Sequence, residues 1–468
     1  MESTKLLKLI STLNGHEQNR FKKFLFSPYF NQLELPQKFF TEVMKLLAHQ
    51  MPLVKEELWK QMFGKQIYRD VKFRRICSDT LKLLEKFLAY REIEKDELQL
   101  HLHLLQGIQQ KNLQSFFPNH YKLIAKHHQL KPNAGADDFY NHFRLEALHN
   151  VHLEKQFSRQ QPLRVKEAMQ HLDHFYWLNK LRYSCAMLHY SRISGVQPEI
   201  SFLNELSSFL SSQKKLPPAI LIYHQVLLTM QHPHNQKYFE KLKEGLNEWL
   251  QHLDKGTAQE LLVFSINYCV RGINSGKLNF LKEVFDLYKL ALNFQVLHNN
   301  KILSPWDYKN ITVTALRLGE DIWAEKFIEK YKNDLPKEER QNAHIYNLAK
   351  LNFYRGNFEK VMQQLQKVEY TDPFYILDSK TMLLKTYFEL DELESLDSLV
   401  HSFRMLLKRK KLISDEHRAN YLHMVNFIKR LSRKKIKGTE LKLIRKEIET
   451  ASHLADKNWL LQKVKELE

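Results

Sequence analysis

His344-Ile-Tyr-Asn-Leu-Ala-Lys-Leu-Asn-Phe-Tyr-Arg-Gly-Asn-Phe-Glu-Lys-Val361 is the stretch that decides the fold, because its plan of apolar, small and aromatic positions recurs along the chain. The segments 343–373 and 378–403 share this plan about 35 residues apart. A period of this size is typical of stacked helical hairpins, in which each hairpin buries its apolar face against the next. The sequence therefore predicts an all-α solenoid.

The repeated positions resemble those of the tetratricopeptide repeat family, most closely over residues 305–405. In 343–373 the matching residues are Leu348, Ala349, Gly356 at the turn, Phe358, Val361 and Pro373 at the exit. In 378–403 they are Leu383, Leu384, Tyr387, Asp391, Leu393, Leu396 and Phe403, without a turn glycine or a closing proline. Upstream, Ile311, Ala315, Gly319, Ala324, Phe327, Tyr331 and Pro336 match a third unit, and Tyr268, Gly276, Phe285 and Tyr288 suggest a fourth.

The resemblance implies where a partner would bind. In that family the first helix of each hairpin lines a concave groove that receives an extended peptide or a partner helix. Carried onto matching positions, the lining is Lys309, Val313, Leu316, Arg317, Tyr346, Lys350, Phe353, Lys385 and Phe388. Lys350 and Lys385 occupy equivalent sites, which favours a cationic groove for acidic side chains or a C-terminal carboxylate. The asparagines of the family's known carboxylate-gripping groove are absent, so ordinary surface lysines are the alternative.

The composition favours helices throughout. Gly and Pro number only 12 and 13 among 468 residues, and β-branched residues nowhere alternate with polar ones between turn signals. We expect four segments: a helical module at 1–100, irregular helical hairpins at 101–300, the repeats at 301–405 and basic helices at 406–468. For the second segment a helical bundle and a solenoid remain equally open.

The N-terminal module contains the phrase Ser27-Pro-Tyr-Phe-Asn31, which resembles the opening of uncharacterised bacterial helical-repeat proteins. Proline should end the preceding helix, and Asn31 can cap the next. Residues 55–63 and 73–88 predict two amphipathic helices, weakly like the winged-helix heads of some bacterial regulators. In such a head Lys72, Arg74, Arg75 and Lys82 would face DNA. A cap closing the apolar end of the solenoid is the favoured interpretation.

A strongly basic region near the C-terminus supplies a second hypothesis. Residues 404–446 hold 15 Lys or Arg and three acids, a local charge of +12 within the formal +19 of the chain. The clustered cations are Lys408, Arg409, Lys410, Lys411, Lys429, Arg430, Arg433, Lys434, Lys435 and Lys437. Such a patch would bind the phosphate backbone of nucleic acid. A solvated face and adsorption to a membrane surface are the alternatives.

The sequence contains no recognisable catalytic or metal-binding motif, so we expect no enzymatic activity, no cofactor and no metal site. The segment 272–278 is one residue short of a phosphate-binding loop and lacks its hydroxyl. Glu146 and His149 have the spacing of a di-iron ligand pair, with His152 on the same face, but no second copy exists. His171 and His174 share a face without a carboxylate at ligand spacing.

The cysteines and the apolar segments of the chain predict where the protein is located. The three cysteines are far apart, which indicates free thiols in a reducing compartment. No stretch suggests a signal peptide or a membrane span. We therefore expect a cytoplasmic scaffold that binds an acidic protein or peptide partner; the oligomeric state stays open.

Overall fold

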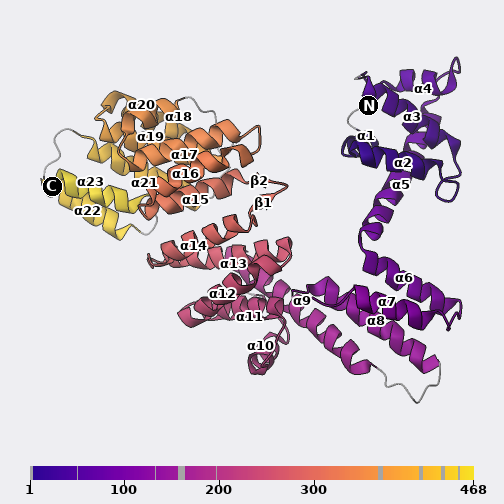
Figure 1. Ribbon diagram of the computed structural model, residues 1–468. Helices are drawn as coiled ribbons and strands as arrows, with labels where there is room; N and C mark the ends of the chain where they lie inside the picture. Colours follow the sequence, from indigo (N-terminus) through magenta and orange to yellow (C-terminus); the bar gives the residue numbers. More distant parts are fainter. Residues whose placement is uncertain are drawn as a thin grey trace. The chain divides into compact units, whose positions relative to one another are not determined.

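The computed structural model describes residues 4–49, 51–131, 133–155, 164–194, 196, 198–366, 373–409, 415–433, 438–451 and 454–468. Within these residues the chain forms 23 α-helices and a single pair of two-residue strands, so the predicted all-α class is confirmed. Figure 1 shows the helices in chain order. They fall into two compact units, Met1–Tyr176 and Trp177–Glu468, and the boundary lies within helix α9 (Val165–Ser194).

Two apolar cores lie in the part of unit 1 that the structure describes. Its helices are α1 (Lys5–Ser11), α2 (Gly15–Phe26), α3 (Glu34–Ala48), α4 (Lys55–Phe63), α5 (Asp70–Lys95), α6 (Glu97–Gln110), α7 (Phe117–His127) and α8 (Ala136–Lys155), followed by the start of α9. Helices α1 to α5 enclose the first core, which is rich in phenylalanine. Helices α6, α7 and α8 enclose the second.

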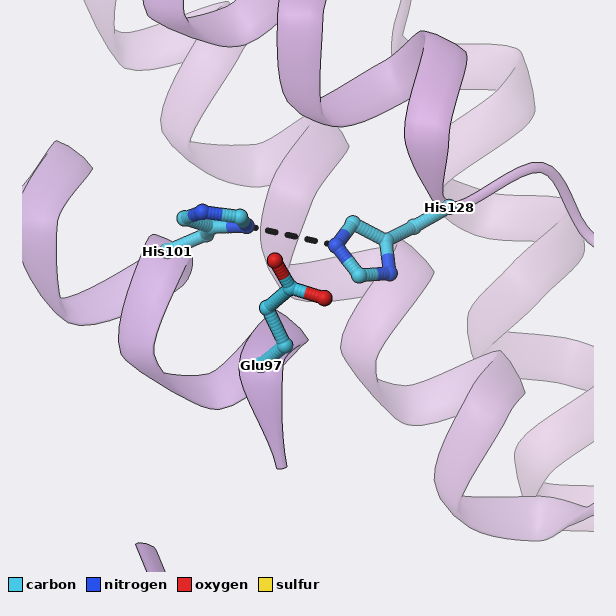
Figure 2. Close-up of side chains that lie close together, drawn as sticks. All are labelled: Glu97, His101 and His128. Carbon is cyan, nitrogen blue, oxygen red and sulfur yellow. Dashed lines mark hydrogen bonds between the residues drawn. The ribbon is translucent and has the colours of Figure 1, made fainter. Parts of the chain in front are cut away.

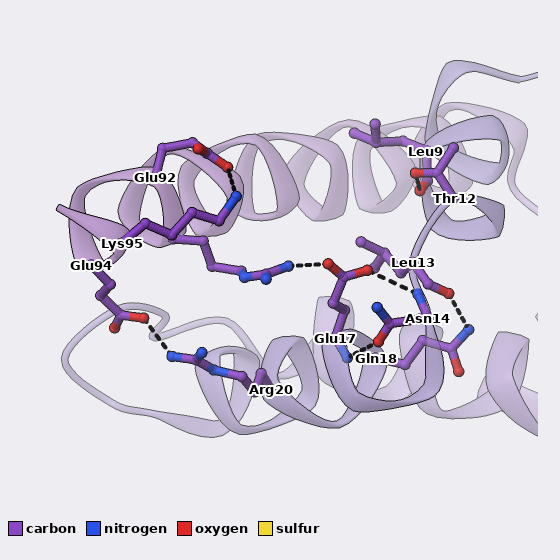
Figure 3. Close-up of polar contacts among 11 residues, drawn as sticks. Leu9, Thr12, Leu13, Asn14, Glu17, Gln18, Arg20, Glu92, Glu94 and Lys95 are labelled. Atoms are coloured by element: carbon purple, nitrogen blue, oxygen red, sulfur yellow. Dashed lines mark hydrogen bonds and ion pairs between the residues drawn. The ribbon is translucent and has the colours of Figure 1, made fainter. Parts of the chain in front are cut away.

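The start of α2 is fixed by local polar contacts that Figure 3 shows together. The Asn14 side chain accepts a hydrogen bond from the Glu17 backbone N–H at 3.0 Å, and the Asn14 N–H donates to the Glu17 carboxylate at 2.9 Å. This reciprocal pair is a capping box. The Glu17 carboxylate also pairs with Arg91, and Arg20 pairs with Glu94. Since Arg91 and Glu94 belong to α5, the ion pairs join α2 to the long helix.

The segment 27–31 only partly follows the prediction. Helix α2 ends at Phe26, ahead of the proline, as expected. The predicted capping role of Asn31 is wrong, because α3 has Leu33 as its N-cap residue. The Asn31 amide instead donates to the backbone carbonyls of Leu25 and Leu33, both at 2.8 Å. These bonds hold the turn together, and one of them gives the Leu25 carbonyl at the end of α2 a partner.

The helix that would face DNA in a winged-helix head is α5, and its Lys72 and Arg74 have partners nearby. Arg74 pairs with Asp70 at 2.7 Å, and the Lys72 ammonium lies 4.4 Å from the centre of the Phe63 ring. In the described part of unit 1 no strand follows α5, so the β-wing of a winged-helix head is not seen there.

Unit 2 is built from consecutive helices that pack in pairs. They are α10 (Leu203–Ser212), α11 (Pro218–Gln231), α12 (Gln236–Trp249), α13 (Lys255–Asn274), α14 (Phe280–Asn293), α15 (Pro305–Arg317), α16 (Asp321–Tyr331), α17 (Arg340–Tyr354), α18 (Phe358–Leu365), α19 (Pro373–Glu389), α20 (Leu393–Arg409), α21 (Asp415–Leu431), α22 (Gly438–Thr450) and α23 (Lys457–Leu467). Strands β1 (His298–Asn299) and β2 (Ile302–Leu303) form a small antiparallel hairpin before α15.

The packing order follows the sequence period. Each of α13, α15, α17 and α19 contacts the helix that follows it, and α15, α17 and α19 also contact one another in succession. Small residues lie at the close contacts: Ala315, Ala324 and Ala349 are each fully buried. A short side chain lets two helix backbones approach closely.

Four turns repeat the same backbone geometry. Gly276, Gly319, Gly356 and Asp391 follow α13, α15, α17 and α19 with φ of 87°, 77°, 75° and 56°. At each turn the next residue's N–H donates to the carbonyl five residues back, at 2.9 to 3.0 Å. This is the Schellman arrangement, which requires a left-handed residue at the helix end. The predicted turn positions of Gly319 and Gly356 are confirmed, and Asp391 takes the same conformation without being glycine.

Candidate functional site

A pocket of about 470 Å³ lies in unit 2 on the helices that the resemblance selected. Side chains of α13, α14, α15, α17 and α19 line it, together with Asp456 just before α23. Of the nine predicted groove residues, seven line this pocket: Lys309, Val313, Arg317, Tyr346, Lys350, Phe353 and Lys385. The structure thus brings together side chains that are up to 76 positions apart in the sequence.

The two remaining groove residues lie elsewhere. Leu316 is buried on α15 with 3% of its surface exposed, so it belongs to the core. Phe388 packs edge-on against Trp459, with ring centres 5.5 Å apart. Neither side chain lines the pocket, and both were selected because helical spacing alone does not separate the pocket face from the adjoining core face.

Lys309 is held inside the protein and is not free to bind a partner. Its ammonium forms an ion pair with Asp378 of α19. Three aromatic rings surround it, with centres at 5.0 Å for Trp306, 5.7 Å for Tyr346 and 4.9 Å for Tyr375. Ring faces attract a cation, and the carboxylate neutralises its charge. Lys309 therefore ties α15 to α19 across α17.

Lys385 is partnered in a similar way. Its side chain is 9% exposed and forms an ion pair with Asp456. The Trp459 ring centre lies 5.2 Å from the Lys385 ammonium, and the Phe353 ring centre 5.9 Å. Asp456 precedes α23 with a left-handed backbone (φ 53°), and its carboxylate makes no capping bond to that helix. The carboxylate pairs with Lys385 instead, so this ion pair joins α19 to the segment before α23.

Arg317 and Lys350 supply the available positive charge. Within the described residues neither cation has an ion pair, although both face Asp456 closely enough to influence it. Burial opposes the effect, but the charges of Lys385, Lys350 and Arg317 together hold the pKa of the Asp456 carboxyl below its usual range. The pocket lining has four cations and two carboxylates, a net charge of +2.

One polar group in the lining lacks a partner. The buried Thr381 hydroxyl oxygen has no hydrogen bond to any described residue. Buried hydroxyls are nearly always satisfied by protein, water or ligand. A ligand in this pocket would meet two cationic side chains beside the rings of Tyr346 and Phe353.

The basic C-terminal cations are only partly free. Lys429 pairs with Asp397 at 3.4 Å, and the Arg430 guanidinium pairs with Glu447. Lys408 and Arg433 are exposed and without an ion pair to described residues. The side chain of Arg409, and the whole of Lys410, Lys411, Lys434, Lys435 and Lys437, lie outside what the structure describes.

Glu146 and His149, which have the spacing of a di-iron ligand pair, make contacts within the protein. The buried Glu146 carboxylate accepts hydrogen bonds from the Tyr121 hydroxyl at 3.0 and 3.1 Å and pairs with Arg164 at 3.1 Å. His149 stacks on the Tyr121 ring with centres 3.9 Å apart. The segment 272–278 ends α13 and forms the Gly276 turn, as predicted.

A different cluster, absent from the sequence prediction, lies in unit 1. The ligand atoms of Glu97, His101 and His128 are all within 4.8 Å of one another (Figure 2). The spacing of Glu97 and His101, four residues apart on one helix, is the sequence signal that could have found two of the three. His128 comes from α7, so only the packing of α6 on α7 reveals it.

Among the described residues, no helix combines the length and the apolar character that a bilayer crossing requires. Comparison of the whole chain with family models, curated proteins and solved structures found no match.

Proposed function

We propose that unit 2 is a tetratricopeptide-like stack of helical hairpins that serves as a non-enzymatic scaffold and binds an acidic peptide segment of a protein partner in the pocket. Four similar turns and the succession α13, α15, α17 and α19 along the lining support the architecture. The single observation that carries the function is the pocket itself, whose lining has a net charge of +2.

Arg317 and Lys350 are the residues that would contact the ligand. Lys309 and Lys385 are occupied by Asp378 and Asp456, so recruiting either lysine would leave a carboxylate without its partner. A guanidinium binds a carboxylate through two parallel hydrogen bonds, and an ammonium adds a third charge-assisted donor. The volume of about 470 Å³ suits one or two residues of a peptide rather than a folded domain.

Selection from a library of peptides with free C-termini tests this proposal. The bait is the full chain, and the reference is the variant Arg317→Glu/Lys350→Glu. We expect wild type to enrich Asp-rich and Glu-rich or free-carboxylate sequences. Loss of a charge-assisted hydrogen bond costs about 1.5–3 kcal/mol, so the selected peptides should bind the variant at least about tenfold more weakly.

The matched control carries the same change of charge away from the pocket. Lys326 on α16 and Lys360 on α18 are exposed and do not line the pocket. Lys326→Glu/Lys360→Glu should bind the selected peptides as wild type does, and circular dichroism should show equal helix content in all three proteins. Equal enrichment by wild type and Arg317→Glu/Lys350→Glu would refute the proposal.

Phosphate binding by the basic C-terminal helices is the second hypothesis. The ion pairs of Lys429 and Arg430 reduce the charge that those helices present. We therefore place the pocket first. A salt titration of binding to random oligonucleotides tests the alternative, since phosphate contacts give a steep dependence on salt.

A further inference from the structure

Two histidines of unit 1 lie at the separation that a shared metal ion imposes. His101 Nδ1 and His128 Nε2 are 3.2 Å apart (Figure 2). Two imidazole nitrogens bound to one tetrahedral zinc ion, each at 2.0–2.1 Å, are separated by roughly 3.3 Å. A Glu97 carboxylate oxygen lies within 4.8 Å of both nitrogens, on the side where a third ligand would stand.

The backbone that carries these side chains is well anchored. Glu97 and His101 are one turn apart on α6, whose Asp96 cap accepts the Gln99 N–H at 3.0 Å. The Gln99 side chain bonds to Asn141 at 2.8 Å and to Arg144 at 2.6 Å, both on α8. The first turn of α6 is thereby fixed against α8.

His128 is placed by the end of α7. It is the residue after the last turn, and its backbone N–H donates to the Ile124 carbonyl at 2.9 Å. Ile124 is buried in the core that α6 and α7 share. A site whose ligands stand on two packed helices needs little rearrangement to accept an ion.

The cluster offers a metal ion both nitrogen lone pairs and negative charge. Two ring nitrogens at 3.2 Å hold at most one proton between them, and the Glu97 carboxylate adds negative charge beside them. Neutral imidazole is the form that binds metals.

We propose that Glu97, His101 and His128 bind one divalent transition-metal ion, Zn²⁺ foremost, with the fourth position left to water. Two imidazole nitrogens and one carboxylate oxygen are a zinc ligand set. Ca²⁺ and Mg²⁺ prefer oxygen ligands alone, so the pair of histidines selects against both. The ion would join the start of α6 to the end of α7.

Competition of Zn²⁺ with a chromophoric chelator, on the full chain at about pH 7, measures the site directly. We expect one equivalent of Zn²⁺ to bind tightly to wild type. His101→Ala and His128→Ala should each weaken this equivalent by at least about tenfold, and Glu97→Gln should weaken it less. Co²⁺ should give the visible absorption of a tetrahedral complex in wild type, but not in His101→Ala or His128→Ala.

His103→Ala is the matched control, because His103 is an exposed histidine on the same helix that is not part of the cluster. It should leave the tight equivalent unchanged. Ten of the 23 histidines lie between residues 101 and 174, so scattered weak binding would appear in every variant alike. The proposal is overturned if the wild-type isotherm matches that of His101→Ala/His128→Ala, or if His103→Ala weakens binding equally.

Discussion

The left-handed turns at Gly319 and Gly356 allow a substitution of glycine by alanine to be compared with the same substitution at a glycine in an ordinary helical position. Gly356 has φ of 75°, and a Cβ added there would meet no atom within 4 Å. The effect of Gly356→Ala therefore comes from the backbone alone. A left-handed conformation costs a residue with a Cβ roughly 1–2 kcal/mol. Alanine also lowers the conformational entropy of the unfolded chain, which stabilises the folded protein by about 0.4–1 kcal/mol. The net loss in the free energy of unfolding should be about 1 kcal/mol.

Gly438→Ala is the matched control in the same unit. Gly438 is the first residue of α22, has no positive φ, and likewise has open space around its Cα. Alanine is the better helix former, so this change should leave stability equal or raise it by up to about 1 kcal/mol. Gly319→Ala, at the equivalent turn one unit earlier, should behave as Gly356→Ala does, because its φ is 77° and its surroundings are also open.

Urea unfolding followed by circular dichroism measures these differences as shifts of the midpoint at constant slope. Asp391→Gly tests the same turn from the other direction. Because Asp tolerates the left-handed region better than most residues, relief of strain and added chain entropy nearly cancel, and stability should stay within about 0.5 kcal/mol of wild type. A Gly356→Ala protein as stable as wild type, or a Gly438→Ala protein that loses as much, would refute the assignment of these turns.

Three other changes test packing, capping and protonation. Ile444→Ala should lower the free energy of unfolding in urea by about 2–5 kcal/mol, because the side chain is fully buried. Leu443→Ala, at the neighbouring residue that is 55% exposed, should stay within about 0.5 kcal/mol of wild type. Equal losses would contradict the packing of α22. Asn14→Ala removes the side-chain half of the capping box and should lower the stability of unit 1 by about 1 kcal/mol, measurable as earlier proteolysis of α2; unchanged cleavage would count against the cap. Burial lowers the pKa of His149 and of His171 to about 4. Below pH 6.5 the unfolded chain therefore binds more protons than the folded chain, and the free energy of unfolding should fall as the pH drops from about 6.5 to 4. A thermal midpoint that stays constant across that range would exclude both shifts.

The helices and turns of unit 2 could be predicted because their signals are local. A glycine such as Gly319 or Gly356 is favoured where the backbone turns left-handed after a helix. A small residue such as Ala315 or Ala349 is favoured where two helices approach closely. Asp391, which lacks the glycine signal, takes the same left-handed conformation after α19. The capping role of Asn31 was wrong because its side-chain oxygen, the atom that would cap a helix, accepts the Leu33 N–H at 2.8 Å instead.

The partners of the pocket lysines could not be predicted. Asp378 lies 69 positions from Lys309, and Asp456 lies 71 positions from Lys385, in a stretch read only as a basic tail. Periodicity identifies which face of a helix is shared, but an ion pair depends on which distant carboxylate folds onto that face. The same limit hid His128, since only the packing of α7 on α6 brings it to His101.

The ion pairs inside the pocket restrict the kinds of ligand that the proposed groove would accept. If all four cations were free, any polyanion would be attracted to them without regard to shape. Asp378 and Asp456 cancel the two buried lysines, and they would repel a third carboxylate placed next to them. What remains is one guanidinium and one ammonium beside aromatic rings, which matches two negative charges at a fixed spacing. A C-terminal residue that is itself Asp or Glu carries such a pair, and so should be preferred over an internal acidic run.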